Sequence, residues 1–120
     1  MSTPSPISGK TILVTEDDFL LALMIKDDLE EQGATVIGPI ASCEETLRLL
    51  RDDVLLDAAI LDINVLDGLI YEAADHLIDH GQPFVFCSSL NRSQIPDRFS
   101  AIPLFSKPID MRRFFESVFH

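Results

Sequence analysis

Five polar side chains in this sequence carry groups that could handle a phosphoryl group if the fold brought them together. Each follows within two residues a short, largely apolar segment with the character of a buried strand. In open α/β sheets, ligands bind beyond the carboxyl ends of the strands, so side chains at those ends meet in one crevice. The set comprises three carboxylates, one hydroxyl and one ammonium group: Glu16 and Asp17 after 11–15, Asp62 after 58–61, Ser88 after 84–87, and Lys107 after 104–105.

The chemistry of these groups favours phosphoryl transfer. Three carboxylates in one crevice repel one another, and at least one pKa would rise unless a cation lay among them. Mg²⁺ suits this position because it prefers carboxylate, carbonyl and water oxygens. Lys107 adds a positive charge that can pair with Asp62 at rest and with an added anion later. A carboxylate oxygen could then attack phosphorus in line, while Lys107 and Ser88 bind the phosphoryl oxygens.

Short apolar segments alternate with helical patterns along the chain. The predicted strands are continuously apolar, which is typical of a parallel sheet covered on both faces, a doubly wound α/β layer. Ser42 and Glu45 predict a capping box, and Pro39 is expected to close the second strand. Gly33 and Gly81 are expected to cap two helices. The predicted strands are 11–15, 34–38, 58–61, 84–87 and 104–105, and the predicted helices are 19–32, 42–53, 69–80 and 109–119.

The predicted helices differ in how clearly they show an inward face. Residues 91–100 contain Pro96 and few apolar anchors, so any helix there should be short or irregular. The helix over 19–32, in contrast, has apolar residues at helical spacing, and we expect these to face the sheet. They are Leu21, Met24, Ile25 and Leu29.

Length and composition exclude several classes of protein. The 120 residues fit one domain, which we expect over 10–120 after a flexible leader over 1–9. The net charge of −11 repels nucleic acid phosphates, so DNA or RNA binding is not expected. Apolar runs fall far short of the roughly 18 residues of a membrane span. Cys43 and Cys87 lack metal-ligand spacing, and we expect reduced thiols in the cytoplasm.

Each signal has a plainer interpretation when it is taken alone. The acidic run 16–18 is also typical of a solvated helix start that favours the helix dipole. Asp62, followed by Asp67-Gly68, could open a turn, Lys107-Pro108 alone indicates little, and Ser88 suits any loop. Their joint appearance after the predicted strands favours the phosphoryl-transfer interpretation.

At this point the sequence resembles the receiver domain of two-component response regulators, the CheY-like phosphoacceptor module. The resemblance runs from about Lys10 to Phe119, and it implies a flavodoxin-like (βα)5 sandwich with a five-stranded parallel sheet. The motifs that carry it are Ile12-Leu13-Val14-Thr15-Glu16-Asp17-Asp18, Ile60-Leu61-Asp62-Ile63-Asn64, Ser88, and Ser106-Lys107-Pro108.

The resemblance also implies a role for each site residue. Asp62 would take the phosphoryl group from a phosphohistidine on a sensor histidine kinase or phosphotransfer protein. Asp17 and Asp62 would bind Mg²⁺ directly, Glu16 through water, and Asn64 through its backbone carbonyl. Lys107 and Ser88 would contact the phosphoryl group.

The same resemblance bears on activity and partners. Beyond self-phosphorylation and slow autodephosphorylation, no enzymatic activity is expected. No other cofactor is expected either. The signal would pass to a partner protein, or the chain is excised from a longer protein. The chain would be a monomer or a weak phosphorylation-dependent dimer.

The sequence departs from the common receiver pattern at three places. Leu104 stands where many receivers carry an aromatic residue, and the proline common after the phosphoacceptor is missing from 63–68. Pro83-Phe84-Val85-Phe86 resembles the opening of the Pro-Phe-x-Phe-Ala-Thr-Gly-Tyr motif of an atypical subgroup, but Cys87-Ser88-Ser89-Leu90 departs from its remainder.

Three rival functions can be distinguished from a phosphoacceptor switch. A haloacid-dehalogenase-like phosphatase needs a second aspartate where this chain has Asn64, and its nucleophile ends the first strand; repeated turnover would reveal it. A flavin-binding module needs a Ser/Thr/Gly-rich phosphate loop where this chain has an acidic run, and bound flavin would colour it. A receiver-shaped interaction module that takes no phosphate is a third possibility, which only an assay decides.

Overall fold

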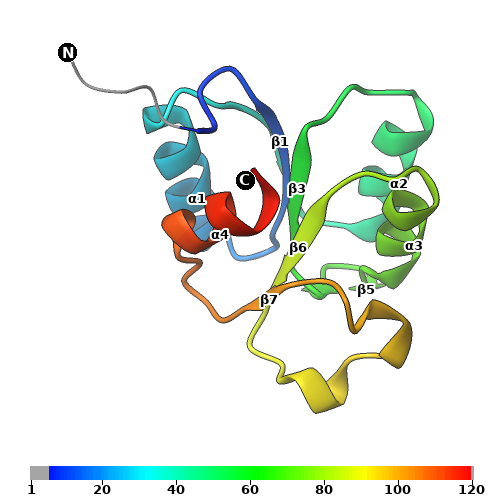
Figure 1. The fold of residues 1–120 in the computed structure, drawn as a ribbon. Coiled ribbons are helices and arrows are strands. Elements are labelled where there is room, and N and C mark those ends of the chain that lie inside the picture. The colour runs from blue at the N-terminus through cyan, green and yellow to red at the C-terminus, as the bar shows by residue number, and fades with distance from the viewer. Residues whose placement is uncertain (1–5, 120) are drawn as a thin grey trace.

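A computed structural model describes residues 6–119, which form an open five-stranded parallel sheet. Its strands are β1 (Thr11–Thr15), β2 (Thr35–Ile40), β3 (Ala58–Leu61), β6 (Phe84–Cys87) and β7 (Leu104–Phe105). The order across the sheet is β2-β1-β3-β6-β7 (Figure 1). Strand order therefore reverses between β1 and β3, where open α/β sheets place their ligands. The predicted α/β fold with a five-stranded parallel sheet is confirmed.

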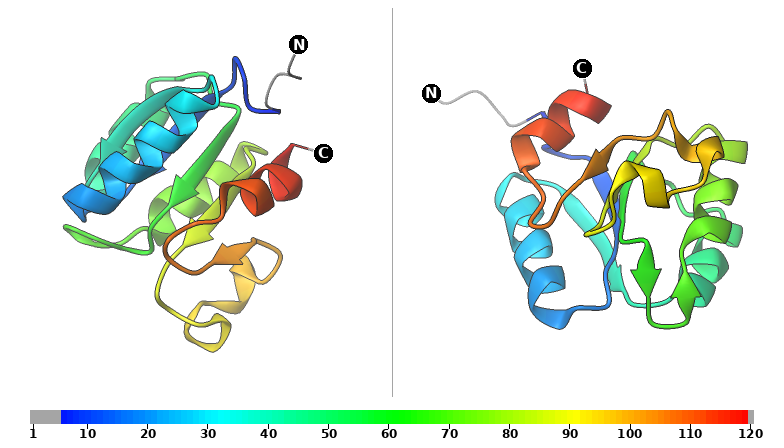
Figure 2. Two further views of the ribbon diagram at one scale, coloured as in Figure 1. Left: turned by 90° about the vertical axis from the view of Figure 1, so that its left-hand side faces the viewer. Right: turned by 90° about the horizontal axis from the view of Figure 1, so that it is seen from below.

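Among the described residues, four α-helices cover the two faces of the sheet (Figure 2). Helices α1 (Phe19–Glu31) and α4 (Met111–Val118) pack on one face through side chains such as Leu29 and Phe114. Helices α2 (Cys43–Arg51) and α3 (Tyr71–Asp79) pack on the other face through Leu47 and Leu77. Because both faces are covered, β1, β3 and β6 are buried almost throughout, which explains their continuous apolar character.

The helix ends follow the capping residues of the sequence. The Asp18 side chain caps α1 by accepting from the N–H groups of Leu20 and Leu21 at 3.0 and 3.1 Å. Ser42 caps α2 by accepting from the Glu45 N–H at 3.1 Å, which is the Ser42 half of the predicted capping box. Gly33 follows α1 with a φ of 92°, a left-handed conformation that glycine adopts without strain, and Gly81 follows α3 with a φ of 65°.

Two predictions about side chains and strand ends were wrong. Met24 is 56% exposed rather than inward, because the stripe that faces the sheet is the narrower one of Ala22, Ile25 and Leu29. Pro39 does not close the second strand, since β2 continues to Ile40. Strand β2 lies at the edge of the sheet, where a missing N–H costs no ladder hydrogen bond.

Part of the expected leader packs against the domain. Residues 1–5 lie outside the described residues, so the prediction for them stays a prediction. Residues 6–9 form a turn in which Ile7 is fully buried and its carbonyl accepts from Lys10 N–H at 2.9 Å. Gly9 N–H donates to the Gly33 carbonyl at 2.9 Å. Over residues 6–9, therefore, the chain is not a loose leader.

The connections after β3 and β6 depart from a regular βα repeat. An antiparallel hairpin of β4 (Asn64–Val65) and β5 (Gly68–Leu69), which was not predicted, precedes α3. Between β6 and β7 the chain forms two 3₁₀ turns, η1 (Arg92–Gln94) and η2 (Asp97–Phe99), instead of an α-helix. This agrees with the irregular structure expected for 91–100. Within residues 6–119, no helix combines the length and apolar character needed to cross a membrane.

Candidate functional site

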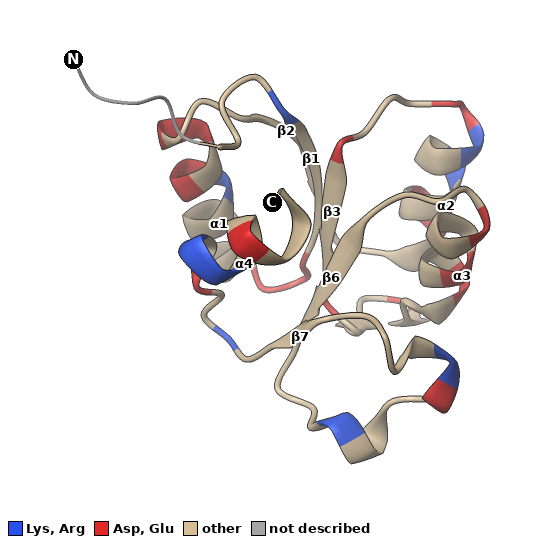
Figure 3. Ribbon diagram, in the orientation of Figure 1, with Lys and Arg blue, Asp and Glu red and all other residues tan. Residues whose placement is uncertain are grey.

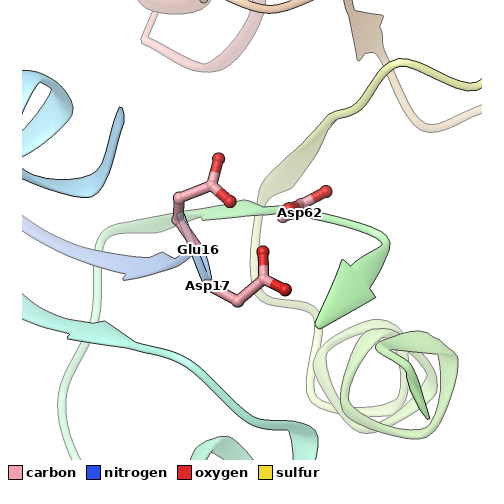
Figure 4. Close-up of side chains that lie close together, drawn as sticks. All are labelled: Glu16, Asp17 and Asp62. Atoms are coloured by element: carbon pink, nitrogen blue, oxygen red, sulfur yellow. The ribbon is translucent and has the colours of Figure 1, made fainter. Parts of the chain in front are cut away.

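Three carboxylates from two distant parts of the chain converge where β1 and β3 end (Figure 4). One oxygen from each of Glu16, Asp17 and Asp62 lies within 4.8 Å of the others. Glu16 and Asp62 are each only 4% exposed, whereas Asp17 is exposed. The predicted cluster of acidic groups therefore exists, with two buried carboxylates and one at the surface.

Lys107 brings a positive charge to the two buried carboxylates. Its Nζ lies 2.8 Å from Asp62 Oδ2 and 3.0 Å from Glu16 Oε1. It follows β7 by two residues, and Figure 3 shows this basic segment near the acidic ends of β1 and β3. The predicted pairing of Lys107 with Asp62 is thus present in the structure.

Backbone hydrogen bonds hold the carboxylates at the ends of their strands. Asp62 N–H donates to the Thr15 carbonyl at 3.1 Å and to Thr15 Oγ1 at 3.2 Å, which extends the β1–β3 pairing by one residue. Glu16 N–H donates to the Ile40 carbonyl at 3.0 Å. Asp18 N–H donates to Glu16 Oε2 at 3.2 Å, so the start of α1 also orients this carboxylate.

The electrostatics of the cluster agree with the expected repulsion. Burial raises the pKa of Glu16 above its usual value, and the neighbouring Asp62 carboxylate raises it further, while Lys107 partly opposes the shift. Burial alone would lower the pKa of Lys107, but its hydrogen bonds to Asp62 and Glu16 outweigh this effect and raise it. Lys107 therefore stays charged, and it shares that charge between two carboxylates.

Ser88 and Asn64 flank the cluster along the chain. Ser88 follows β6, is only 1% exposed, and its Oγ accepts from Leu90 N–H at 3.2 Å. Asn64 begins β4 two residues after Asp62 and is exposed. The roles predicted for both residues stay predictions.

Two contacts near the site were not foreseen from the sequence. One is the Thr15 side chain, whose Oγ1 accepts from Asp62 N–H. The other is Asp67, whose carboxylate oxygens accept from the N–H groups of Cys43 at 2.7 Å and Glu44 at 3.0 Å, so it caps α2 from the β4–β5 turn. The position of Thr15 just before Glu16 was a usable signal, but nothing in the sequence pairs Asp67 with a helix 23 residues away.

The cluster suits a divalent cation. Three carboxylates lie together, and Lys107 pairs with only two of them, Glu16 and Asp62. Burial and then the neighbouring Asp62 carboxylate raise the pKa of Glu16, and a cation in the cluster would oppose that shift. The donors are all oxygens, which a hard ion such as Mg²⁺ prefers. On this ground Glu16, Asp17 and Asp62 could together hold such an ion.

Comparisons with known proteins agree with this fold. No protein-family model matches the chain, and no curated protein matches its sequence. The solution structure of SdrG from Sphingomonas melonis Fr1 is 31% identical, with 94% of each chain covered and a TM-score of 0.76. The BeF3-activated conformation of SdrG from Pseudomonas melonis Fr1 is also 31% identical, with 91% of this chain and 92% of that chain covered and a TM-score of 0.73.

Two further solved structures are similar over nearly their whole length. The signal receiver domain of a modulated diguanylate cyclase from Desulfovibrio desulfuricans G20 is 26% identical, covers 94% of this chain and 95% of its own, and has a TM-score of 0.79. The CheY-like response regulator receiver domain from Methylobacillus flagellatus is 21% identical and has the same fold, with a TM-score of 0.76 over 92% of this chain and 99% of its own.

The doubly wound sheet with an acidic cluster at its switch point is the architecture of signalling receivers. The chain belongs to the response regulator receiver domain family. Membership of the atypical subgroup suggested by Pro83-Phe84-Val85-Phe86 stays a prediction.

Proposed function

We propose that this receiver domain is a phosphorylation switch in which Asp62 accepts a phosphoryl group. The observation that supports this most directly is the position of Asp62, a buried carboxylate at the switch point with Lys107 Nζ 2.8 Å from its Oδ2. A carboxylate whose only role was to stabilise the fold would not need two further carboxylates beside it. Repulsion among the three carboxylates costs stability unless a bound cation offsets it.

In the proposed reaction, a carboxylate oxygen of Asp62 forms a bond to phosphorus. The donor is a phosphohistidine on a sensor histidine kinase or phosphotransfer protein. Its P–N bond breaks, the electron pair stays on the imidazole nitrogen, and the product is an acyl phosphate. The two equivalent oxygens of Asp62 mean that one can attack while the other keeps its contact to Lys107.

The surrounding residues would bind and orient the incoming group. Lys107 would turn one of its N–H donors to a phosphoryl oxygen, and the Ser88 hydroxyl, whose oxygen accepts from Leu90 N–H, would donate its proton to another. Mg²⁺, held by Glu16, Asp17, Asp62 and the Asn64 carbonyl, would neutralise charge on the phosphoryl oxygens when bound.

The output of this switch would pass to a partner protein, and the chain would be a monomer or a weak dimer that forms on phosphorylation. The site needs no activity beyond its own phosphorylation and slow autodephosphorylation. A small-molecule phosphatase, in contrast, would release phosphate many times per chain.

The test is intact-mass analysis of the protein after incubation with acetyl phosphate and Mg²⁺. We expect the wild type to gain the mass of one phosphoryl group, and Asp62→Asn to gain none. Asp79→Asn, which removes an acid at the end of α3, is the matched control and should be phosphorylated normally. An Asp62→Asn variant that is modified as fully as wild type, or a wild type that is never modified, would refute the proposal; catalytic consumption of acetyl phosphate would favour a phosphatase.

A further inference from the structure

Two segments of the chain leave the site separately and meet again beside α3. The first runs from Asp62 through the β4–β5 hairpin into α3, and Ile70 N–H donates back to the Ile63 carbonyl at 2.9 Å. The second runs from Ser88 through η1 to η2, which ends at Phe99 (yellow to orange in Figure 1). Contacts where these segments meet therefore bear on how Ser88 and Asp62 lie relative to each other.

Aromatic rings form the inner part of this meeting point. Tyr71, the first residue of α3, stacks on Phe99 with ring centroids 5.2 Å apart and an interplanar angle of 26°. Phe99 also meets Phe86 edge to face at 5.4 Å. Phe86 and Phe99 are both fully buried, and Phe86 lies in β6 two residues before Ser88. Phe99 of η2 therefore contacts both α3 and β6, the strand that Ser88 follows.

An ion pair between Arg98 and Asp75 forms the outer part of this meeting point. Arg98 Nε and Nη2 donate to the two Asp75 carboxylate oxygens at 3.0 and 3.2 Å, a bidentate geometry that fixes orientation as well as distance. The guanidinium also lies over the Phe99 ring, 4.5 Å from its centroid, and 6.0 Å from the centroid of Tyr71. Arg98 therefore holds η2 against α3 through one carboxylate and two rings.

Hydrogen bonds restrain the segment between Ser88 and the Arg98–Asp75 ion pair. Ser88 N–H donates to the Phe105 carbonyl at 2.9 Å, and Ser88 Oγ accepts from Leu90 N–H. Arg92 bridges the carbonyls of Phe99 and Ile102 at 3.1 and 2.6 Å. A shift of η2 away from α3 would consequently pull on the turn that orients the Ser88 hydroxyl.

We propose that Tyr71, Asp75, Arg98 and Phe99, which we call the Arg98 clamp, position Ser88 to bind the phosphoryl group on Asp62. Arg98 would touch no reacting atom, so it is a positioning residue that acts through Phe99, Phe86 and the turn at Ser88. The inference rests on the proposed function, since it gives the clamp a role in holding the same phosphoryl group.

The experiment measures binding of beryllofluoride, a phosphoryl analogue, in saturating Mg²⁺, together with the Mg²⁺ affinity alone. We expect Arg98→Gln to weaken beryllofluoride binding roughly 2- to 30-fold, the range found for coupling through packed contacts. Mg²⁺ affinity should not change, because the carboxylates of the site are untouched. Arg98→Lys should restore part of the loss, and Asp75→Asn combined with Arg98→Gln should bind no more weakly than Arg98→Gln alone.

Arg48→Gln is the matched control, because it also removes an exposed arginine from an ion pair, here with Glu44 at 3.2 Å. The inference is overturned if Arg98→Gln binds beryllofluoride as Arg48→Gln does, or if it loses Mg²⁺ and beryllofluoride affinity by the same factor. Hydrogen exchange of the Leu90 amide gives a second readout that needs no phosphoryl group, and it should be faster in Arg98→Gln. If the wild type bound no beryllofluoride, the proposed function would be contradicted. If Leu90 exchanged at the same rate in Arg98→Gln and wild type, the positioning role of the clamp would be contradicted while the proposed function stood.

Discussion

The acidic cluster and the Arg98 clamp differ in how deeply their charged side chains are buried and in how the charges are balanced. At the cluster, the buried carboxylates of Glu16 and Asp62 share the single charge of Lys107. At the clamp, Arg98 pairs with the single carboxylate of Asp75, and the two side chains are 54% and 44% exposed, respectively. The more buried part of this contact consists of aromatic rings. Charge is thus concentrated inside the protein at one place and kept near the solvent at the other.

This difference indicates what each region is built to do. A buried surplus of negative charge opposes folding, so its presence at the switch point suits a site that a cation completes. The clamp gains most of its stability from buried rings, and its exposed ion pair adds orientation more than free energy. Changes to the two regions should therefore have different effects on stability.

The largest loss of stability is expected from Phe99→Ala. Phe99 is fully buried against Tyr71 and Phe86, so its removal should lower the free energy of unfolding by about 3–5 kcal/mol. Urea denaturation followed by circular dichroism would measure this. Phe115→Ala, at a half-buried ring of α4, is the control and should lose less. A loss for Phe99→Ala smaller than that of the control would contradict the view that buried rings stabilise the clamp.

A smaller loss is expected from Lys107→Met. The substitution leaves Glu16 and Asp62 buried without their shared cation, and we expect a loss of about 1–3 kcal/mol, part of which Mg²⁺ should restore. Thermal unfolding with and without Mg²⁺ would test this, with Lys26→Met on α1 as the control. If Lys107→Met were as stable as wild type without Mg²⁺, the surplus charge at the cluster would not matter for stability.

Arg98→Gln should change stability by less than about 1 kcal/mol, because its ion pair with Asp75 is exposed to solvent. The same urea titration would measure the difference from wild type. A loss as large as that of Lys107→Met would mean that the ion pair, and not the rings alone, stabilises the clamp.

The smallest effect concerns the pH dependence of the clamp. Burial raises the pKa of Tyr71, and the charge of Arg98 partly opposes this shift. The unfolded chain ionises its tyrosine first, so the stability that Tyr71 contributes is present below about pH 10 and is lost as pH rises through the folded pKa. Tyr71 is the only tyrosine in the chain, so tyrosinate absorbance reports it alone. Arg98→Gln should raise the pKa further; a lower value in the variant would contradict this description.

Much of the fold follows from local pattern. The continuous apolar character of β3 and β6 reflects burial on both faces, and both strands have their predicted bounds. Asp18, Ser42, Gly33 and Gly81 end or begin helices as their residue types favour, because caps depend on neighbours within a few residues. Met24 was misplaced because helical spacing alone does not define how wide the buried stripe is.

The convergence of the site residues was predictable because they follow strands of one sheet. Asp62 and Lys107 are 45 residues apart, yet both follow strands of one parallel sheet, whose carboxyl ends share an edge. Their convergence therefore needs only the strand assignment and no knowledge of individual contacts. The phosphoacceptor chemistry itself stays a prediction until the mass measurement is made.

What the sequence determined by itself was the alternation of strands and helices and the polar residues that follow each strand, since both depend on local spacing. Only the tertiary structure decided which distant side chains pair: Arg98 with Asp75, Tyr71 with Phe99, and Asp67 with the start of α2. The physical reason is that such pairs depend on how 3₁₀ turns and helix ends are oriented after packing, and residue type or periodicity does not specify those orientations.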